Sequence, residues 1–185
     1  MKKGVLIVLV LFLPSLVYVP PSSGLPAEDV QVVTDAQYFQ TAIKMIQEAK
    51  TSIHVMMFEM VYYEEHANSP SNLLIRELIH AKKRGVKVDV LLEIREEEDR
   101  TSKNNRHSGK TLADGGVEVT YDPSFKTTHA KVLIVDGKLT LLGSTNWTYH
   151  ALTSNHETSL LLRSKEVAKE LIDYFTRVKG SGNRH

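Results

Sequence analysis

Two short motifs on either side of a predicted turn constrain the fold of this chain most strongly. They are His129-Ala130-Lys131-Val132-Leu133-Ile134-Val135-Asp136 and Gly143-Ser144-Thr145-Asn146. The apolar, largely β-branched run within 131–135 predicts a strand that is buried on both faces. The turn is predicted at Asp136-Gly137, because glycine tolerates the positive φ that tight hairpin turns require. A return strand over 139–142 then brings the second motif back beside the first.

This hairpin gathers four polar side chains into one patch. His129 and Lys131 are two residues apart, so on a strand they project to the same side. Ser144 and Asn146 return to the level at which the outgoing strand begins. An imidazole can attack phosphorus or protonate a leaving oxygen. Lysine and asparagine can stabilise charge on phosphoryl oxygens, so the patch suits a phosphodiester.

Two features of the patch decide between its chemical interpretations. It contains no carboxylate cluster or second histidine at metal-ligand spacing, so we expect neither a metal nor another cofactor. The alternative to a catalytic site is a structural histidine beside a lysine whose amine reaches solvent. That alternative is disfavoured because burying an unpaired charge is costly.

The two motifs resemble the signature of the phospholipase D superfamily, which is H-x-K-x4-D followed by G-S-x-N. The likeness extends over about residues 30–178. It implies that His129 becomes transiently phosphorylated, that Lys131 and Asn146 bind the phosphate, and that Ser144 belongs to the same catalytic set. It also implies that Asp136, together with Gly143, is structural.

A glutamate further along the chain completes the resemblance. Glu157 stands where members of the superfamily carry a carboxylate that pairs with the second ring nitrogen of the histidine. Such a carboxylate would fix the histidine tautomer and stabilise the imidazolium. The alternative is an ordinary carboxylate at the start of a strand.

The number of motifs bears on the oligomeric state. The chain has 185 residues, which suits one domain, and it carries a single H-x-K-x4-D motif. Members of the superfamily bring two such motifs together, either within one chain or by pairing two copies. An isologous interface can place both copies of His129 at one phosphate. The resemblance therefore implies a homodimer.

Three further residues are candidates for contacts with substrate. Tyr62 lies in a polar loop over 62–70 that could line a substrate entrance or serve only as a surface loop. Asn104 lies in a predicted helix, where superfamily members often carry a polar residue that contacts substrate, and Asn105 is its alternative. Residues 104–107 are otherwise expected to form a solvated helix face. Lys126 precedes His129 and could flank the phosphate.

The alternation of apolar patterns predicts an α/β domain over 25–185. Strands are expected over 30–33, 52–60, 86–94, 117–121, 131–135, 139–142 and 158–162, and helices over 35–50, 72–84, 102–114 and 164–178. Helices between strands favour a sheet covered on both faces, and the hairpin makes that sheet mixed. This is the α-β-α sandwich with a mixed central sheet that the phospholipase D-like resemblance implies.

The first 24 residues are predicted to direct export. Lys2-Lys3 and the apolar run 4–19 are typical of a secretory signal peptide, with an uncleaved N-terminal anchor as the alternative. The run is interrupted at Pro14 and is shorter than the roughly 20 residues of a standard membrane span. We therefore expect a secreted or extracytoplasmic protein, or one anchored to a membrane by this segment.

The charge balance leaves the substrate open. Without Lys2 and Lys3, 21 of the 23 basic residues remain against 22 acidic ones, so there is no basic surplus of the kind typical of nucleic-acid-binding proteins. Among short single-motif members, the resemblance is nearest to exported endonucleases, and nucleic acid is the first expectation. A phospholipid hydrolase is the alternative. A non-catalytic module that binds phosphate or nucleic acid is the second alternative.

Overall fold

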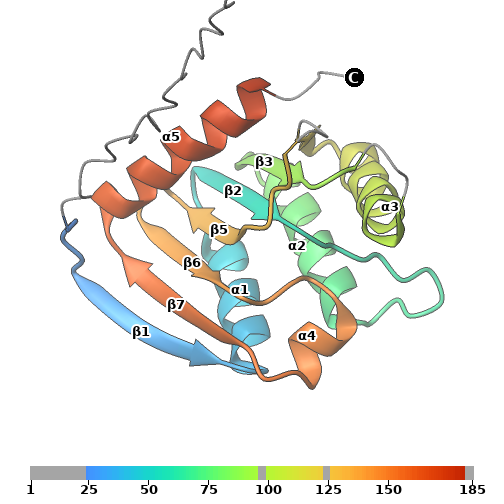
Figure 1. The fold of residues 1–185 in the computed structure, drawn as a ribbon, viewed down its shortest axis with the longest axis horizontal. Helices are drawn as coiled ribbons and strands as arrows, with labels where there is room; N and C mark the ends of the chain where they lie inside the picture. Colours follow the sequence, from blue (N-terminus) through green and yellow to red (C-terminus); the bar gives the residue numbers. More distant parts are fainter. Residues whose placement is uncertain (1–23, 96–98, 123–125, 182–185) are drawn as a thin grey trace, which may run out of the picture.

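A seven-stranded mixed sheet forms the centre of the computed structural model, which describes residues 24–95, 99–122 and 126–181 (Figure 1). The strands are β1 (Asp29–Thr34), β2 (Ser52–Met57), β3 (Lys87–Leu92), β4 (Glu118–Tyr121), β5 (Lys131–Val135), β6 (Leu139–Gly143) and β7 (Thr158–Arg163). Their order across the sheet is β1-β7-β6-β5-β2-β3-β4. Strands β2, β3 and β4 are parallel, whereas the other neighbouring pairs are antiparallel.

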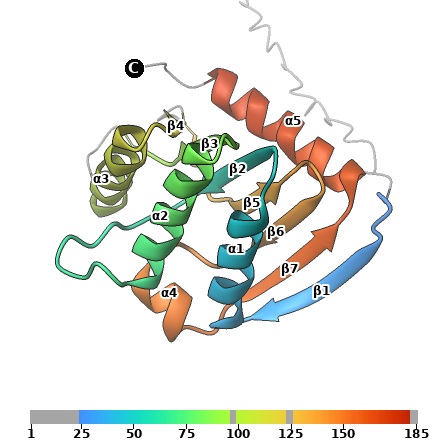
Figure 2. The ribbon, with the colours of Figure 1, turned by 180° about the vertical axis from the view of Figure 1, so that it is seen from behind.

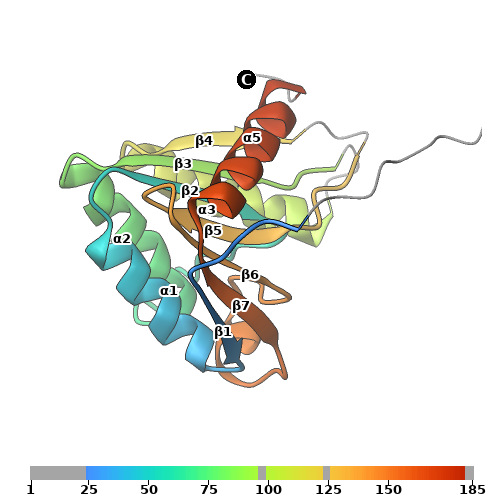
Figure 3. The same cartoon turned by 90° about the vertical axis from the view of Figure 1, so that its left-hand side faces the viewer.

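Helices cover both faces of this sheet. They are α1 (Gln37–Glu48), α2 (Pro70–Lys83), α3 (Arg100–Asp114), α4 (Tyr149–Thr153) and α5 (Lys165–Ser181). Helices α1 and α2 pack against each other on one face (Figure 2), and α5 crosses the opposite face over β2 and β6 (Figure 3). Helix α3 packs against α2 and β4. The predicted α-β-α sandwich with a mixed sheet is confirmed.

The alternation of side chains along β2 explains how both faces become apolar. Val55 and Met57 point into the main core beneath α1 and α2. Met56 points the other way and packs with Leu91 and Phe175 of α5 in a second, smaller cluster. Because successive residues of a strand face opposite sides, a strand covered by helices on both faces must be apolar throughout.

The predicted hairpin is present, and its turn has the predicted backbone. Asp136 and Gly137 have φ values of 54° and 57°, which is the left-handed conformation required at both central positions of a tight turn. Val132 pairs with Leu142, so Gly143 comes level with Lys131. The second motif therefore begins beside the first, as the sequence indicates.

The helix ends show where the sequence pattern was incomplete. Helix α2 begins two residues before its predicted start, because Ser69 caps it and Pro70 occupies its first turn. Helix α4 was not predicted, since its five residues are too few to show a helical period. Thr148 caps it by accepting a hydrogen bond from the backbone N–H of Ala151, 3.4 Å away.

The export prediction for residues 1–24 falls on a segment that lies, up to residue 23, outside the described residues. Within the ranges that the structure does describe, no helix is both long enough and apolar enough to cross a membrane.

Asp136 connects the hairpin turn to the segment before β2. Its carboxylate accepts hydrogen bonds from the backbone N–H groups of Lys50, Thr51 and Ser52, at 3.0, 2.7 and 3.1 Å. The Thr51 hydroxyl donates a further bond at 2.9 Å. Burial works against ionisation, but these donors outweigh it and lower the pKa of Asp136 below its ordinary value. The carboxylate therefore stabilises the start of β2 and the turn together.

Replacing Asp136 with asparagine should destabilise the fold by about 2 kcal/mol, because charge-assisted hydrogen bonds are lost. Since the folded pKa lies below the unfolded one, this contribution is present above the unfolded value of about 4 and is lost as the pH falls through the folded pKa. Urea unfolding at pH 7 and again near pH 3 measures the difference. Asp173→Asn is the control, because its carboxylate forms only an exposed pair with Lys169. Equal destabilisation at both pH values would contradict the account.

Candidate active site

His129 lies on the surface at the start of β5, beside the carboxyl end of β2. Phe58, the residue after β2, donates its backbone N–H to the carbonyl of Ala130 at 3.0 Å. The Phe58 ring packs against the imidazole, with 4.6 Å between centroids and 57° between planes. The imidazole of this exposed residue is thus held by an aromatic ring.

Lys131 lies beneath His129 and is only 5% exposed. Its Nζ donates to the carbonyl of His129 at 2.9 Å and lies 4.8 Å from the centroid of the Phe58 ring. Burial lowers the pKa of Lys131, and the charge of Glu157 opposes that shift. An ammonium carries three donors, and the His129 carbonyl takes one. The remaining donors can bind an anion placed beside the imidazole.

Ser144 and Glu157 form the opposite part of the site, where β6 ends and β7 begins. The Ser144 hydroxyl donates to the Glu157 carboxylate and accepts from the backbone N–H of Thr158 at 3.2 Å. Asn155 donates to the other carboxylate oxygen at 3.2 Å. The backbone N–H of Glu157 donates to the Asp35 carboxylate at 2.9 Å. Hydrogen bonds therefore fix both the side chain and the backbone of Glu157.

The implied pairing of Glu157 with His129 is not formed in this structure. No ion pair within 4.0 Å joins the two side chains, both of which lie in the described ranges. The oxygens of Glu157 instead accept hydrogen bonds from Ser144 and Asn155. The negative charge acts on the Lys131 ammonium, where it partly offsets the lowering of the pKa that burial causes.

The G-S-x-N segment is held by the tryptophan that follows it. Trp147 is fully buried, its indole N–H donates to the Tyr38 hydroxyl at 3.2 Å, and its backbone N–H donates to the carbonyl of Glu59 at 3.0 Å. The neighbouring Asn146 is partly buried, and its carboxamide oxygen has no hydrogen-bond partner within the described part of the chain. The backbone of Asn146 is therefore held by the buried Trp147 beside it, while its carboxamide oxygen accepts no hydrogen bond from the described residues.

Gly143 permits a close approach between β6 and β7. A Cβ atom at this position would collide with the Ser159 side chain and with the carbonyl of Thr158. The glycine thus allows Ser144 to reach the start of β7.

Residues 42–179 match the family model described as "Cardiolipin synthase, PLD-like domain". The chain belongs to the phospholipase D superfamily. It is 31% identical to mitochondrial cardiolipin hydrolase of Canis lupus familiaris, over 55% of this chain and 37% of that protein. It is 30% identical to phospholipase D of Rickettsia typhi, over 69% of this chain and 59% of that protein. The chain thus spans about half the length of these relatives.

A solved structure of the superfamily matches more completely. Nuc from Salmonella typhimurium, a phospholipase D family member, aligns with a TM-score of 0.71 at 26% identity, over 85% of this chain and 97% of Nuc. Phosphatidylserine synthase of Haemophilus influenzae shares the fold at a TM-score of 0.66 and 18% identity, over 84% of this chain and 38% of that one. The predicted superfamily and fold are therefore confirmed.

The three candidates for contacts with substrate lie in two separate places. Tyr62 and Asn104 line one open cavity of about 620 Å³, where the Tyr62 ring lies 5.7 Å from that of His107. The Asn104 amide donates to the Glu59 carboxylate at 2.9 Å. Lys126 instead lines a different cavity, of about 330 Å³, beside the residues that lead to His129. The structure brings the first two together and leaves the third apart.

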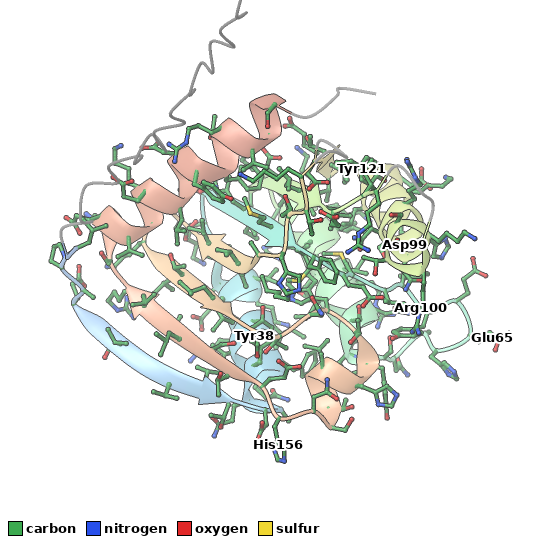
Figure 4. All side chains as sticks on the ribbon, viewed as in Figure 1. Tyr38, Glu65, Asp99, Arg100, Tyr121 and His156 are labelled. Carbon is green, nitrogen blue, oxygen red and sulfur yellow. The ribbon has the colours of Figure 1, made fainter. Side chains whose placement is uncertain are left out.

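The approach to the first cavity carries both signs of charge. Figure 4 shows Arg100, at the start of α3, beside the loop that carries Glu65, and both residues line this cavity.

Among the described residues, no group of three or more histidine, cysteine or acidic side chains is placed to hold a metal ion.

The expectation that residues 104–107 form a solvated face was wrong for Asn105. This side chain is fully buried. It accepts a hydrogen bond from the backbone N–H of Met60 at 2.8 Å and donates to the carbonyls of Phe58 and Glu93 at 2.7 and 2.8 Å. The segments after β2 and β3 need a hydrogen-bonding partner because they are no longer paired as strands, and Asn105 provides it.

The buried carboxyl groups of Glu93 and Asp122, which are 1% and 2% exposed, were not predicted from the sequence. They follow β3 and β4, two adjacent parallel strands, and so they lie at one edge of the sheet. The available signal was an acidic residue at the end of each of these two strands. Phe58 showed no comparable signal, because an aromatic residue after a strand is common.

Proposed function

We propose that this protein is a phosphodiester hydrolase in which His129 is the nucleophile. The observation that carries the proposal is the exposed imidazole of His129, held against the Phe58 ring with the Lys131 ammonium beneath it. A nucleophile must be accessible and oriented, and a fixed cation nearby must meet the charge that develops on the phosphoryl oxygens. Within the described residues, the Lys131 ammonium gives one hydrogen bond, to the carbonyl of His129, so its other donors can serve that purpose.

The reaction proceeds in two displacements. A ring nitrogen of His129 forms a bond to phosphorus while the bond to the leaving oxygen breaks, and an acid protonates that oxygen. Water then attacks the phosphohistidine, the P–N bond breaks, and the proton of the water returns to the group that acted as acid. Lys131 and Asn146 bind the phosphoryl oxygens in both steps, and Glu157 holds the Ser144 side of the site.

The acid in this scheme comes from a second copy of the chain. The sequence carries one H-x-K-x4-D motif, and the imidazole of His129 cannot attack phosphorus and protonate the leaving oxygen in the same step. A homodimer with a two-fold axis at the site would supply an identical imidazole. The exposure of His129 supports this arrangement, because a second subunit can reach it.

Nucleic acid is the substrate that we propose first, with DNA and RNA both open. The match to Nuc over 97% of its length supports a compact enzyme similar to this phospholipase D family member. The 62–70 loop exposes Glu64 and Glu65 and is not an apolar surface suited to a bilayer. Phospholipid is the alternative, because the sequence relatives are named for cardiolipin and phospholipid hydrolysis.

We infer that this activity takes place outside the cytoplasm. The pair Lys2-Lys3 followed by an apolar run supports export, with retention at a membrane by the same segment as the alternative.

A substrate panel tests the proposal. The full chain is assayed with plasmid DNA, single-stranded DNA, RNA and phosphatidylcholine vesicles, each with excess EDTA. We expect cleavage of nucleic acid that survives EDTA and falls with added salt, because phosphate contacts release counterions. Turnover of phospholipid alone would keep the mechanism and change the substrate. Binding without turnover on every substrate would replace the proposal with a non-catalytic phosphate-binding module.

A further inference from the structure

Two buried carboxyl groups hold the residue that precedes His129. Glu93 and Asp122 follow the neighbouring strands β3 and β4, and both are almost fully buried. The backbone N–H of Thr128 lies 2.6 Å from Glu93 Oε2 and 3.0 Å from Asp122 Oδ2. One N–H group therefore points at two carboxyl groups at once, directly before the proposed nucleophile.

The two groups are not equivalent in their hydrogen bonding. Asp122 accepts from two backbone groups, since its Oδ1 takes the N–H of Ile94 at 2.9 Å and its Oδ2 takes that of Thr128. Glu93 Oε1 has no hydrogen-bond partner in the described structure and lies 3.6 Å from Arg95 Nε. Asp122 is thus satisfied as a carboxylate, and Glu93 is the member that can carry a proton.

The surroundings favour one proton on the pair. Burial, and then the hydrogen bond to Asp122, raise the pKa of Glu93 to about 7. Two adjacent buried carboxylates repel, so the second ionisation is unfavourable. Among the described residues, the charged groups that act on Glu93 are Asp122, which opposes its ionisation, and Arg95, which favours it. Arg95 is half-exposed and is itself paired with Asp99 at 3.0 Å, so its effect on Glu93 is shared.

The pair connects to His129 by two routes. Thr128, which it holds, is the neighbour of His129 in the chain. Asn105 donates to the carbonyls of both Glu93 and Phe58, and the Phe58 ring packs against the imidazole. A movement of the carboxyl pair would therefore shift the backbone before His129 through Thr128, while Asn105 links the backbone of Glu93 to the segment that carries the supporting ring.

We propose that Glu93 and Asp122 share one proton and act as positioning residues that hold His129 in place through the N–H of Thr128. The role of His129 rests on the proposed function, whereas the shared proton does not. Loss of that proton leaves two buried charges at one N–H group, which loosens the contact. The device makes the position of the nucleophile depend on pH.

The backbone amide proton of Thr128 reports on the pair directly. Its NMR chemical shift is followed from pH 5 to 9 in the full chain. We expect it to lie far downfield and to titrate with a midpoint near pH 7. The same titration in His129→Ala shows that the midpoint does not belong to the imidazole. A flat profile in both proteins would overturn the proposal, whether or not the protein is active.

Two substitutions at Glu93 separate positioning from a general effect on folding. Glutamine keeps the acceptor for Thr128 and a donor for Asp122, so Glu93→Gln mimics the protonated pair permanently. We expect its Thr128 amide not to titrate, and its ratio of kcat at pH 8.5 to kcat at pH 6 to exceed the wild-type ratio about threefold. Glu93→Ala should lower kcat about tenfold with little change in KM, because a misplaced nucleophile slows chemistry more than binding.

The comparison of the two variants decides the outcome. Equal kcat and equal pH profiles in wild type and both variants would overturn the positioning role. If Glu93→Ala does not fold, the proposal is still tested by the Thr128 amide shift, which should titrate in the wild type and not in Glu93→Gln. If the protein proves inactive on every substrate, the titrations still test the shared proton, because they need no activity. Failure of the proposed function is therefore distinguished from failure of the proposal for Glu93 and Asp122.

Discussion

Replacing His129 with alanine should lower the rate of phosphodiester hydrolysis by about four orders of magnitude or more, the scale seen when a covalent nucleophile is removed. The remaining groups, Lys131 and Asn146, can still bind phosphate, so binding should persist. Hydrolysis of bis(4-nitrophenyl) phosphate measures turnover, and phosphate-dependent protection against thermal unfolding measures binding. The expected pattern is therefore lost chemistry with retained affinity.

Because the imidazole is exposed, this test separates a loss of chemistry from a loss of stability. Because the His129 side chain is at the surface, its removal should change the unfolding free energy by less than about 0.5 kcal/mol. His80→Ala is the matched control, since His80 is an exposed histidine on α2 whose ion pair within the described part of the chain is with Glu77, at 3.2 Å. It should leave the rate unchanged. A His129→Ala protein that retained a tenth of the wild-type rate would contradict the nucleophile assignment.

Mixed dimers of wild type and His129→Ala should be almost inactive. If two copies of His129 serve one phosphate, then a dimer with one imidazole has lost either the nucleophile or the acid. Independent sites would instead leave each mixed dimer with half the activity. The two arrangements therefore predict different results from the same sample.

The experiment needs the mixed species alone. Two differently tagged chains are co-expressed, and the heterodimer is purified through both tags in sequence. A mixed dimer of two wild-type chains with the same tags is the control for the tags. Half the control activity would show that each protomer works by itself, and an exclusively monomeric protein would remove the basis of the shared site.

Much of the fold followed from local patterns in the sequence. The run 131–135 and the Asp136-Gly137 turn predicted the hairpin, because strand burial and turn conformation depend on adjacent residues. The helices between the strands predicted the sandwich for the same reason. Helix α4 was missed since it is too short to show a period.

The site was predictable only where one hairpin creates it. His129, Lys131 and Ser144 come together through a single turn, so their proximity could be read from the sequence. The partners of Glu157 could not, because the donors to its oxygens are Ser144 and Asn155 and not the imidazole that the resemblance implies.

The buried support of the site depends on contacts between distant segments. Glu93, Asp122 and Thr128 meet because β3 and β4 are neighbours in the sheet and the chain then returns to β5. Asn105 likewise joins α3 to the segments that follow β2 and β3. No local pattern distinguishes such residues from solvated ones, so only the packed structure identifies them.

The central claim, that His129 carries the phosphoryl group during turnover, is tested most directly by trapping it. The full chain is mixed with a 32P-labelled phosphodiester, quenched in alkali within milliseconds and digested with trypsin. Cleavage after Lys126 and Lys131 releases Thr-Thr-His-Ala-Lys, in which His129 is the single histidine. The account predicts an acid-labile, alkali-stable label on this peptide. Turnover of the substrate in the same sample with no label on the peptide would contradict it.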